Sequence, residues 1–207
     1  MYERSEFRVL PRRLAAGAYI FWYFFTGTYP IKNYPSSGET IIAFGDSLVE
    51  GVGSTQGNDF VSLLSARINT PIINLGHPGD TTAEAFARID IVLSKNPKVV
   101  MVLLGGNDFL KRVPKHEMLS NLEQIITAIQ SKGAVAILLG VRGGLITDSY
   151  ESDLKSLAQK MGSAYVPNVL KGLIGDPKYM DDSVHPNNAG YAIIADHVYP
   201  VLFKVLN

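Results

Sequence analysis

Residues 99–104 read VVMVLL, an unbroken apolar run that ends in the polar sequence GGND at residues 105–108. A second run of this kind, AVAILL, occupies residues 134–139. Strands that are apolar at every position are typical of a parallel sheet covered by helices on both faces, because neither face of the strand meets water. The sequence therefore predicts an α/β fold built around a buried parallel sheet.

Short β-rich runs alternate with longer segments of helical period along the rest of the chain. This alternation predicts a three-layer α/β/α sandwich with a central parallel sheet of five strands. Polar motifs follow three of the strands, at the edge where sites gather in such sheets. The predicted strands are residues 40–44, 72–75, 98–104, 134–139 and 164–167, and the predicted helices are residues 59–68, 81–94, 114–131, 149–161 and 188–205.

The overall composition excludes several classes of function. Lys plus Arg and Asp plus Glu both total 19, so the chain has no broad basic surface for nucleic acid, and we expect no nucleic-acid partner. The chain has no cysteine, which excludes disulfides, thiolate metal sites and a cysteine nucleophile. Since the histidines have no second ligand at metal spacing, neither a metal nor another cofactor is expected.

Residues 14–31 carry no charge and follow Arg12 and Arg13. They are barely long enough for the ~20 residues that a helix needs to cross a bilayer. Aromatic residues at 21–25 and the lack of a small-residue cleavage site favour an uncleaved membrane anchor, with the rest of the chain facing the periplasm or the cell exterior. A cleaved export signal and a helix docked on the domain are the alternatives. We therefore divide the chain into an anchor (1–31), a linker (32–38) and a catalytic domain (39–207).

Two distant segments supply the residue types of a serine hydrolase. Ser47 stands in GDS directly after the first predicted strand, while Asp182 and His185 stand in DSVHP near the end of the chain. A serine hydroxyl becomes a strong nucleophile when an imidazole removes its proton, and a carboxylate can hold that imidazole in the required tautomer. Activity should accordingly rise with pH as the histidine loses its proton.

An acyl-transfer site also needs hydrogen-bond donors for the oxyanion that forms on the substrate. Three donors are candidates: the backbone amide of Ser47, the backbone amide of Gly76 and the side-chain amide of Asn107. Gly76 ends the second predicted strand in NLG, and Asn107 follows two glycines that tolerate a tight turn. Taken alone, a glycine at a strand end is more often only a turn residue.

The four blocks GDSL (45–48), NLGHPGDTT (74–82), GND (106–108) and DSVHPN (182–187) occur in order and together resemble the SGNH (GDSL) hydrolase superfamily. The resemblance covers residues 39–207 and is strongest to its bacterial esterase, acyl-thioesterase and lysophospholipase branch. It implies a flavodoxin-like α/β/α fold, with Ser47 as the nucleophile, His185 as the base and Asp182 as its partner. Gly76 and Asn107 would complete the oxyanion hole.

The expected substrates are small acyl esters or lipid-like molecules: carboxylesters, thioesters or lysophospholipids. Phe109, Leu110, Leu145 and Ile146 are apolar residues predicted near the rim of the site, where they could line an acyl pocket or lie partly in the core. A carbohydrate O-acetyl esterase is the alternative within the superfamily. A membrane-tethered binding module without activity is the alternative from another class.

Overall fold

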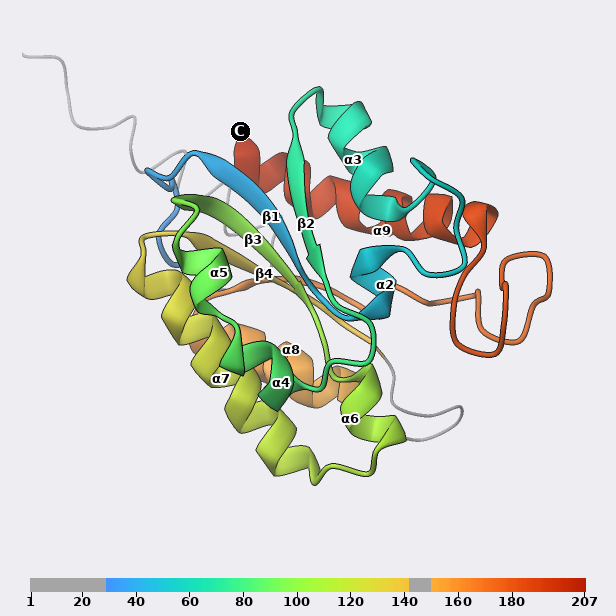
Figure 1. Cartoon of the computed structure of the whole chain (residues 1–207). Helices are drawn as coiled ribbons and strands as arrows, with labels where there is room; N and C mark the ends of the chain where they lie inside the picture. Colours follow the sequence, from blue (N-terminus) through green and yellow to red (C-terminus); the bar gives the residue numbers. More distant parts are fainter. Residues whose placement is uncertain (1–28, 142–149) are drawn as a thin grey trace, which may run out of the picture. The chain divides into compact units, whose positions relative to one another are not determined.

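The apolar runs form one parallel five-stranded sheet in the computed structural model, which describes residues 29–141 and 150–207 (Figure 1). The strand order is β2-β1-β3-β4-β5, and every neighbouring pair is parallel. The predicted fold and its strands are thus confirmed, with ends that shift by no more than a residue. The strands are β1 (Thr40–Gly45), β2 (Ile72–Gly76), β3 (Pro97–Leu103), β4 (Val135–Leu139) and β5 (Ala164–Val166).

Helices cover both faces of the sheet, as the alternating pattern predicts. In Figure 1, α3 and α9 lie together on one face, whereas α4, α5, α7 and α8 lie on the other. The four-residue α2 directly follows β1, and the five-residue α6 begins soon after β3, so both sit at the carboxyl edge of the sheet. The helices are α2 (Ser47–Glu50), α3 (Phe60–Ile68), α4 (Thr82–Ala87), α5 (Asp90–Leu93), α6 (Gly106–Leu110), α7 (Lys115–Ser131), α8 (Tyr150–Met161) and α9 (Asn188–Leu206).

The single helix predicted over residues 81–94 is wrong in part, because the segment forms α4 and α5 with a break between them. The start is as expected: Thr81 caps α4 in a capping box with Glu84. The break falls at Arg88, whose amide bonds to the carbonyls of Ala85 and Phe86 instead of continuing the α-helical ladder. The side chain of Arg88 turns back to the sheet.

Both faces of the sheet are buried. Ile42, Phe44, Val100 and Val102 point to one face and pack with apolar residues of α4, α7 and α8. Because side chains alternate along a strand, Ile41, Met101 and their neighbours point to the opposite face, where α3 and α9 contribute their own buried residues. Burial on both faces explains why β3 and β4 have no polar side.

The register of the sheet aligns the ends of its first three strands. Gly45 of β1 pairs with Gly76 of β2 and with Leu103 of β3. Three loops that are distant in sequence therefore leave the sheet side by side, and these loops carry Ser47, residues 77–81 and Asn107. The predicted gathering of the polar motifs at one edge follows directly from this register.

The segment predicted as a linker, residues 32–38, is part of the compact unit Ile31–Asn207. The side-chain amide of Asn33 donates to the carbonyls of Gln130 and Ala134, and the hydroxyl of Ser36 donates to the carbonyl of Gly133. These hydrogen bonds give the segment fixed partners around the end of α7, so the folded unit begins earlier than its turn-rich composition suggests.

The predicted anchor at residues 14–31 lies almost entirely in residues 1–28, outside the described residues, and it stays a prediction. Within the described residues, α9 is long and apolar enough to cross a membrane by length and composition alone. Its buried residues, which include Tyr191, Ile194 and Val198, belong to the layer that α9 shares with α3 against the sheet. Packing of this kind is that of a core helix.

Candidate active site

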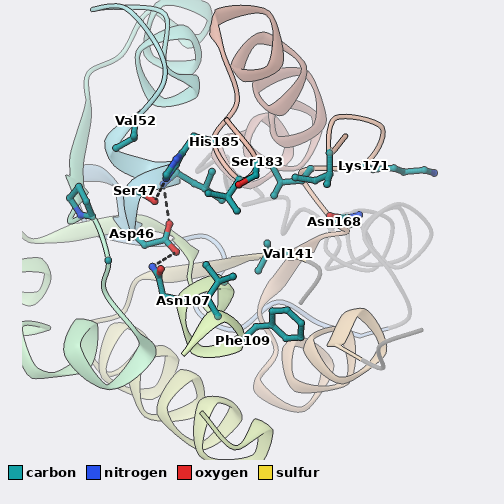
Figure 2. Close-up of a pocket in the computed structure, with 18 of the residues that line it drawn as sticks. Asp46, Ser47, Val52, Asn107, Phe109, Val141, Asn168, Lys171, Ser183 and His185 are labelled. Carbon is teal, nitrogen blue, oxygen red and sulfur yellow. Dashed lines mark hydrogen bonds between the residues drawn. The ribbon is translucent and has the colours of Figure 1, made fainter. Parts of the chain in front are cut away.

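The structure brings together Ser47, His185 and Asp182 at the carboxyl edge of the sheet. Figure 2 shows Ser47 beside His185. The distance from Ser47 Oγ to His185 Nε2 is 3.0 Å, and that from His185 Nδ1 to Asp182 Oδ2 is 2.7 Å. Both distances are within hydrogen-bond range, so the imidazole contacts the hydroxyl with one nitrogen and the carboxylate with the other. This is the geometry in which a serine hydroxyl can transfer its proton to a histidine.

Asp182 is held as a carboxylate. Its Oδ1 accepts hydrogen bonds from the backbone amides of Val184 and His185, both at 2.7 Å. The hydrogen bond with the His185 ring, followed by these two amides, lowers the pKa of Asp182 to about 2. Since the tight turn at residues 182–185 supplies all three bonds, the acid stays charged and aimed at the ring across the neutral pH range.

Hydrogen bonds attach the segment around His185 to the segment that follows Ser47. Thr55 and Asn188 form a reciprocal pair, in which the Thr55 amide donates to Asn188 Oδ1 and Asn188 Nδ2 donates to Thr55 Oγ1, at 2.8 and 2.9 Å. The buried Tyr191 of α9 donates its hydroxyl to the carbonyl of Val52 at 2.8 Å. These bonds connect parts of the chain more than a hundred residues apart and fix His185 relative to Ser47.

Ser47 is the first residue of α2. Asp46 caps this short helix by accepting from the Leu48 amide at 3.0 Å. An amide in the first turn of a helix has no partner within the helix, so the Ser47 N–H can serve another acceptor. Ser47 also lines the cleft.

The structure does not support the oxyanion role expected for Gly76. Its amide donates to Asn74 Oδ1 at 2.9 Å, and the residue is not among those that line the cleft. A side chain at position 76 would collide with the backbone of α2 at Val49 and Glu50. Gly76 therefore allows the close approach of β2 and α2.

Gly79 lines the cleft with Ser47 and Asn107. It has a positive φ of 86°, which favours glycine, and a Cβ there would meet nothing within 4 Å. Within the described part of the chain its N–H has no hydrogen-bond partner. Sequence reasoning missed Gly79, although the Pro78-Gly79 pair just before the helix cap at Thr81 was a turn signal that could have found it.

Asn107 lies near the start of α6 and lines the cleft together with Gly79. Its side-chain Nδ2 donates to the carbonyl of Asp80 at 3.0 Å and to Asp46 Oδ2 at 3.3 Å, the contact drawn in Figure 2. The following residue, Asp108, is fully buried and accepts from both the amide and the hydroxyl of Thr82. The loop after β3 is thus joined to the loop before α4, with Asn107 between Asp46 and Asp80.

Asp46 is a carboxyl group buried beside the nucleophile, with only 3% of its surface exposed. Desolvation raises the pKa of Asp46 to about 6, although the Leu48 amide and nearby His185 favour its charged form. Burial thus outweighs two favourable contacts. The group gains or loses its proton under mildly acidic conditions, while Asp182 stays charged.

This pKa predicts a pH-dependent contribution to stability. Because the pKa of Asp46 is higher in the fold than its ordinary value of 3.8, the folded state binds the proton more tightly. This stabilisation is full below pH ~4 and is lost as the pH rises through about 6. Between about pH 4.5 and 7 the melting temperature of Asp46→Asn should therefore fall less than that of the wild type, by a few degrees, since 1 kcal/mol shifts a domain of this size by about 2–4 °C.

The comparison is made by calorimetry at both pH values, with Asp196→Asn as the control. Asp196 is an exposed carboxylate whose partner is Arg67, so its removal should leave the pH dependence as in the wild type. An unchanged pH dependence in Asp46→Asn would contradict the raised pKa.

Ser47, the proposed nucleophile, lies in the wall of a cleft of about 700 Å³. Apolar side chains form much of its wall, and four exposed large hydrophobic residues gather on it: Phe109, Leu110, Ile174 and Val184. In Figure 2, Phe109 and Val141 lie in the part of the cleft away from Ser47 and His185. The predicted rim positions of Phe109 and Leu110 fit the structure, whereas Leu145 and Ile146 lie outside the described residues. The described residues contain no group of three or more side chains that could hold a metal ion.

Comparison with known proteins indicates one family. Residues 43–193 match the GDSL-like lipase/acylhydrolase family. The chain is 27% identical to esterase TesA of Pseudomonas aeruginosa, over 83% of this chain and 91% of that protein. It is 29% identical to an arylesterase of Vibrio mimicus, over 82% of this chain and 91% of the relative. It is also 26% identical to thioesterase 1/protease 1/lysophospholipase L1 of Escherichia coli, over 83% of this chain and 87% of that protein.

Solved structures share the fold. The crystal structure of TesA superposes with a TM-score of 0.73 and covers 81% of this chain and all of its own. AlinE4, an SGNH-hydrolase family esterase, is 31% identical, with a TM-score of 0.63 over 83% of this chain and all of its own. The family match spans β1 to the start of α9 and includes every residue of the serine, histidine and aspartate cluster. The chain therefore belongs to the GDSL-like lipase/acylhydrolase family.

Proposed function

We propose that this protein hydrolyses esters and thioesters of apolar acyl groups through an acyl-enzyme on Ser47. The observation that carries the proposal is the continuous series of hydrogen bonds from Ser47 through His185 to Asp182. Ser47 and His185 line a cleft whose wall is largely apolar. The names of the relatives, esterase, arylesterase and thioesterase/lysophospholipase, support an ester-bond hydrolase.

In the proposed reaction, Ser47 Oγ attacks the substrate carbonyl carbon while His185 Nε2 takes the hydroxyl proton. Asp182 stabilises the imidazolium that forms and keeps its Nδ1–H directed at the carboxylate. The tetrahedral intermediate then collapses, and His185 returns the proton to the departing alcohol or thiol. Water repeats these steps on the acyl-enzyme and releases the acid.

The oxyanion of the intermediate would lie among the Ser47 amide, the Gly79 amide and the Asn107 side chain. The two amides are supported as donors because both residues line the cleft and neither amide has a partner elsewhere in the described residues. Asn107 would exchange its longer bond, that of 3.3 Å to Asp46, for one to the oxyanion. Donors placed for the developing charge stabilise the transition state more than the substrate.

The wall of the cleft indicates the acyl group. Four large apolar side chains of this wall, Phe109, Leu110, Ile174 and Val184, stay exposed, which costs free energy until an apolar group covers them. An acetyl group is too small to cover a wall of this size. Longer acyl chains are therefore the better substrates in this proposal, in preference to the O-acetyl groups of a carbohydrate esterase.

A panel of p-nitrophenyl esters and acyl-thioesters of increasing acyl length tests the proposal on the purified full-length protein. We expect kcat/KM to rise from acetyl to medium-length chains, by roughly fourfold for each added methylene that is buried, given ~0.8 kcal/mol per CH₂. A fluorophosphonate should label Ser47 stoichiometrically. A related esterase, EstA of Pseudoalteromonas, has been crystallised with monoethylphosphonate as its inhibitor.

Each result of the panel separates the candidates. Hydrolysis of acetyl esters alone would favour the carbohydrate O-acetyl esterase. If neither hydrolysis nor labelling occurs, the hydrolase proposal fails and the binding module becomes the better interpretation.

A further inference from the structure

Arg88 caps the C-terminal end of α4 and is not one of the residues that line the cleft. Its guanidinium makes three hydrogen bonds: Nε donates to Asp80 Oδ2 at 2.6 Å, one terminal nitrogen donates to the carbonyl of Leu75 at 3.1 Å, and the other donates to the carbonyl of Gly45 at 2.9 Å. It also stacks over the ring of Phe44, 4.5 Å from the centroid. With 27% of its side chain exposed, Arg88 is largely enclosed by these partners.

The three acceptors belong to the segments that carry the proposed oxyanion donors. Gly45 ends β1 and is two residues before Ser47. Asp80 directly follows Gly79, and only 7% of its side chain is exposed. The backbone carbonyl of Asp80 in turn accepts from Asn107. Each proposed donor is therefore within two residues, or one hydrogen bond, of a group that Arg88 holds.

We propose that Arg88 is a positioning residue, which sets the spacing of the oxyanion donors through Asp80 and the ends of β1 and β2. The inference rests on the proposed function, whose transition state needs these donors. Displacement of a catalytic group by ~1 Å can cost about 10²-fold in rate. Arg88 can therefore affect the reaction through its hydrogen bonds to these segments, without contacting the substrate. A planar guanidinium suits this role because its fixed donors reach three acceptors at once.

A purely structural role for Arg88 gives a different expectation. If Arg88 only attached α4 to the sheet, its loss would lower the melting temperature but leave kcat of the folded protein unchanged. A positioning role predicts a lower kcat at a nearly constant KM, because the donors act on the oxyanion and not on the bound ester. The split between kcat and KM therefore separates the two roles.

Arg88→Lys in the full-length protein is the informative variant. The lysine keeps the positive charge near Asp80 but cannot donate to all three acceptors in one plane. We expect kcat to fall by about 10- to 100-fold, which is below the loss of about 10²- to 10³-fold expected for Asn107→Ala, in which a donor itself is removed. KM for the same ester should stay close to that of the wild type.

Arg67→Lys is the matched control. Arg67 also forms an ion pair with an aspartate, Asp196 at 2.7 Å, and also stacks on an aromatic ring, that of Tyr199 at 3.7 Å. It belongs to α3 and does not line the cleft. Wild-type kcat and KM are expected for this variant, so any loss in Arg88→Lys comes from the position and not from the chemistry of the substitution.

A second measurement does not depend on activity. In ¹H–¹⁵N spectra, the backbone amide signals of Ser47 and Gly79 should shift in Arg88→Lys and stay in place in Arg67→Lys. Unchanged signals, or a wild-type kcat in Arg88→Lys, would overturn the inference. If the wild type itself hydrolyses no ester and binds no phosphonate, the proposed function fails, and the amide signals alone decide whether Arg88 holds these groups.

Discussion

Ser47→Ala should reduce kcat by a factor on the order of 10⁶, since a triad acts as one unit and loses nearly all of its effect when the nucleophile is removed. The hydroxyl is the group 3.0 Å from His185 Nε2, and no other hydroxyl in the described residues is hydrogen-bonded to that ring. Initial rates on a p-nitrophenyl ester, together with mass spectrometry of the fluorophosphonate adduct, measure the loss. The variant should form no adduct.

Ser156→Ala is a suitable control, because Ser156 is an exposed serine on α8 whose hydroxyl bonds, among the described residues, only to a carbonyl of its own helix. It should retain wild-type activity and labelling. Hydrolysis by Ser47→Ala at the wild-type rate would disprove the covalent mechanism and with it the role of the whole cluster.

Asp182→Asn is expected to have the second largest effect, about 10⁴-fold in kcat, because the amide no longer stabilises the imidazolium or fixes its tautomer. The substitution is nearly isosteric. Oδ1 can still accept from the amides of Val184 and His185, so the turn that carries the base should persist. The profile of kcat/KM against pH, measured on a short ester, distinguishes loss of the negative charge at position 182 from unfolding of the variant.

The neighbouring Asp181→Asn serves as its control, since within the described residues that carboxylate makes no hydrogen bond to His185. Its activity should match the wild type. An Asp182→Asn variant with kcat within a few-fold of the wild type would show that the imidazole acts without a carboxylate partner.

The sheet could be predicted because its strands are buried on both faces. Residues 99–104 and 134–139 have no polar position, a pattern that few other structures produce. The site at its edge follows from the same fact, because polar motifs directly after such strands must meet at their carboxyl ends. The positions of Ser47 and Asn107 could be predicted for this reason, whereas His185 was predicted from the motif that it forms with Asp182.

Other features depend on contacts that have no local signal. Both Gly76 and Gly79 stand near the end of β2, and only the path of the chain in space shows that Gly76 packs against α2 while Gly79 reaches the cleft. The break between α4 and α5 likewise occurs where Arg88 turns toward Asp80 and the ends of two strands. Long-range partners decide such details, and helical periodicity does not contain them.

The pairing of Thr55 with Asn188, and of Val52 with Tyr191, has a consequence for the newly made chain. The serine leaves the ribosome long before the histidine, and the two meet only when α9 closes against α3. A half-synthesised or half-folded chain therefore carries a serine with ordinary reactivity. Ser47 is therefore paired with His185 only in a chain whose C-terminal segment has been made and has folded against the rest.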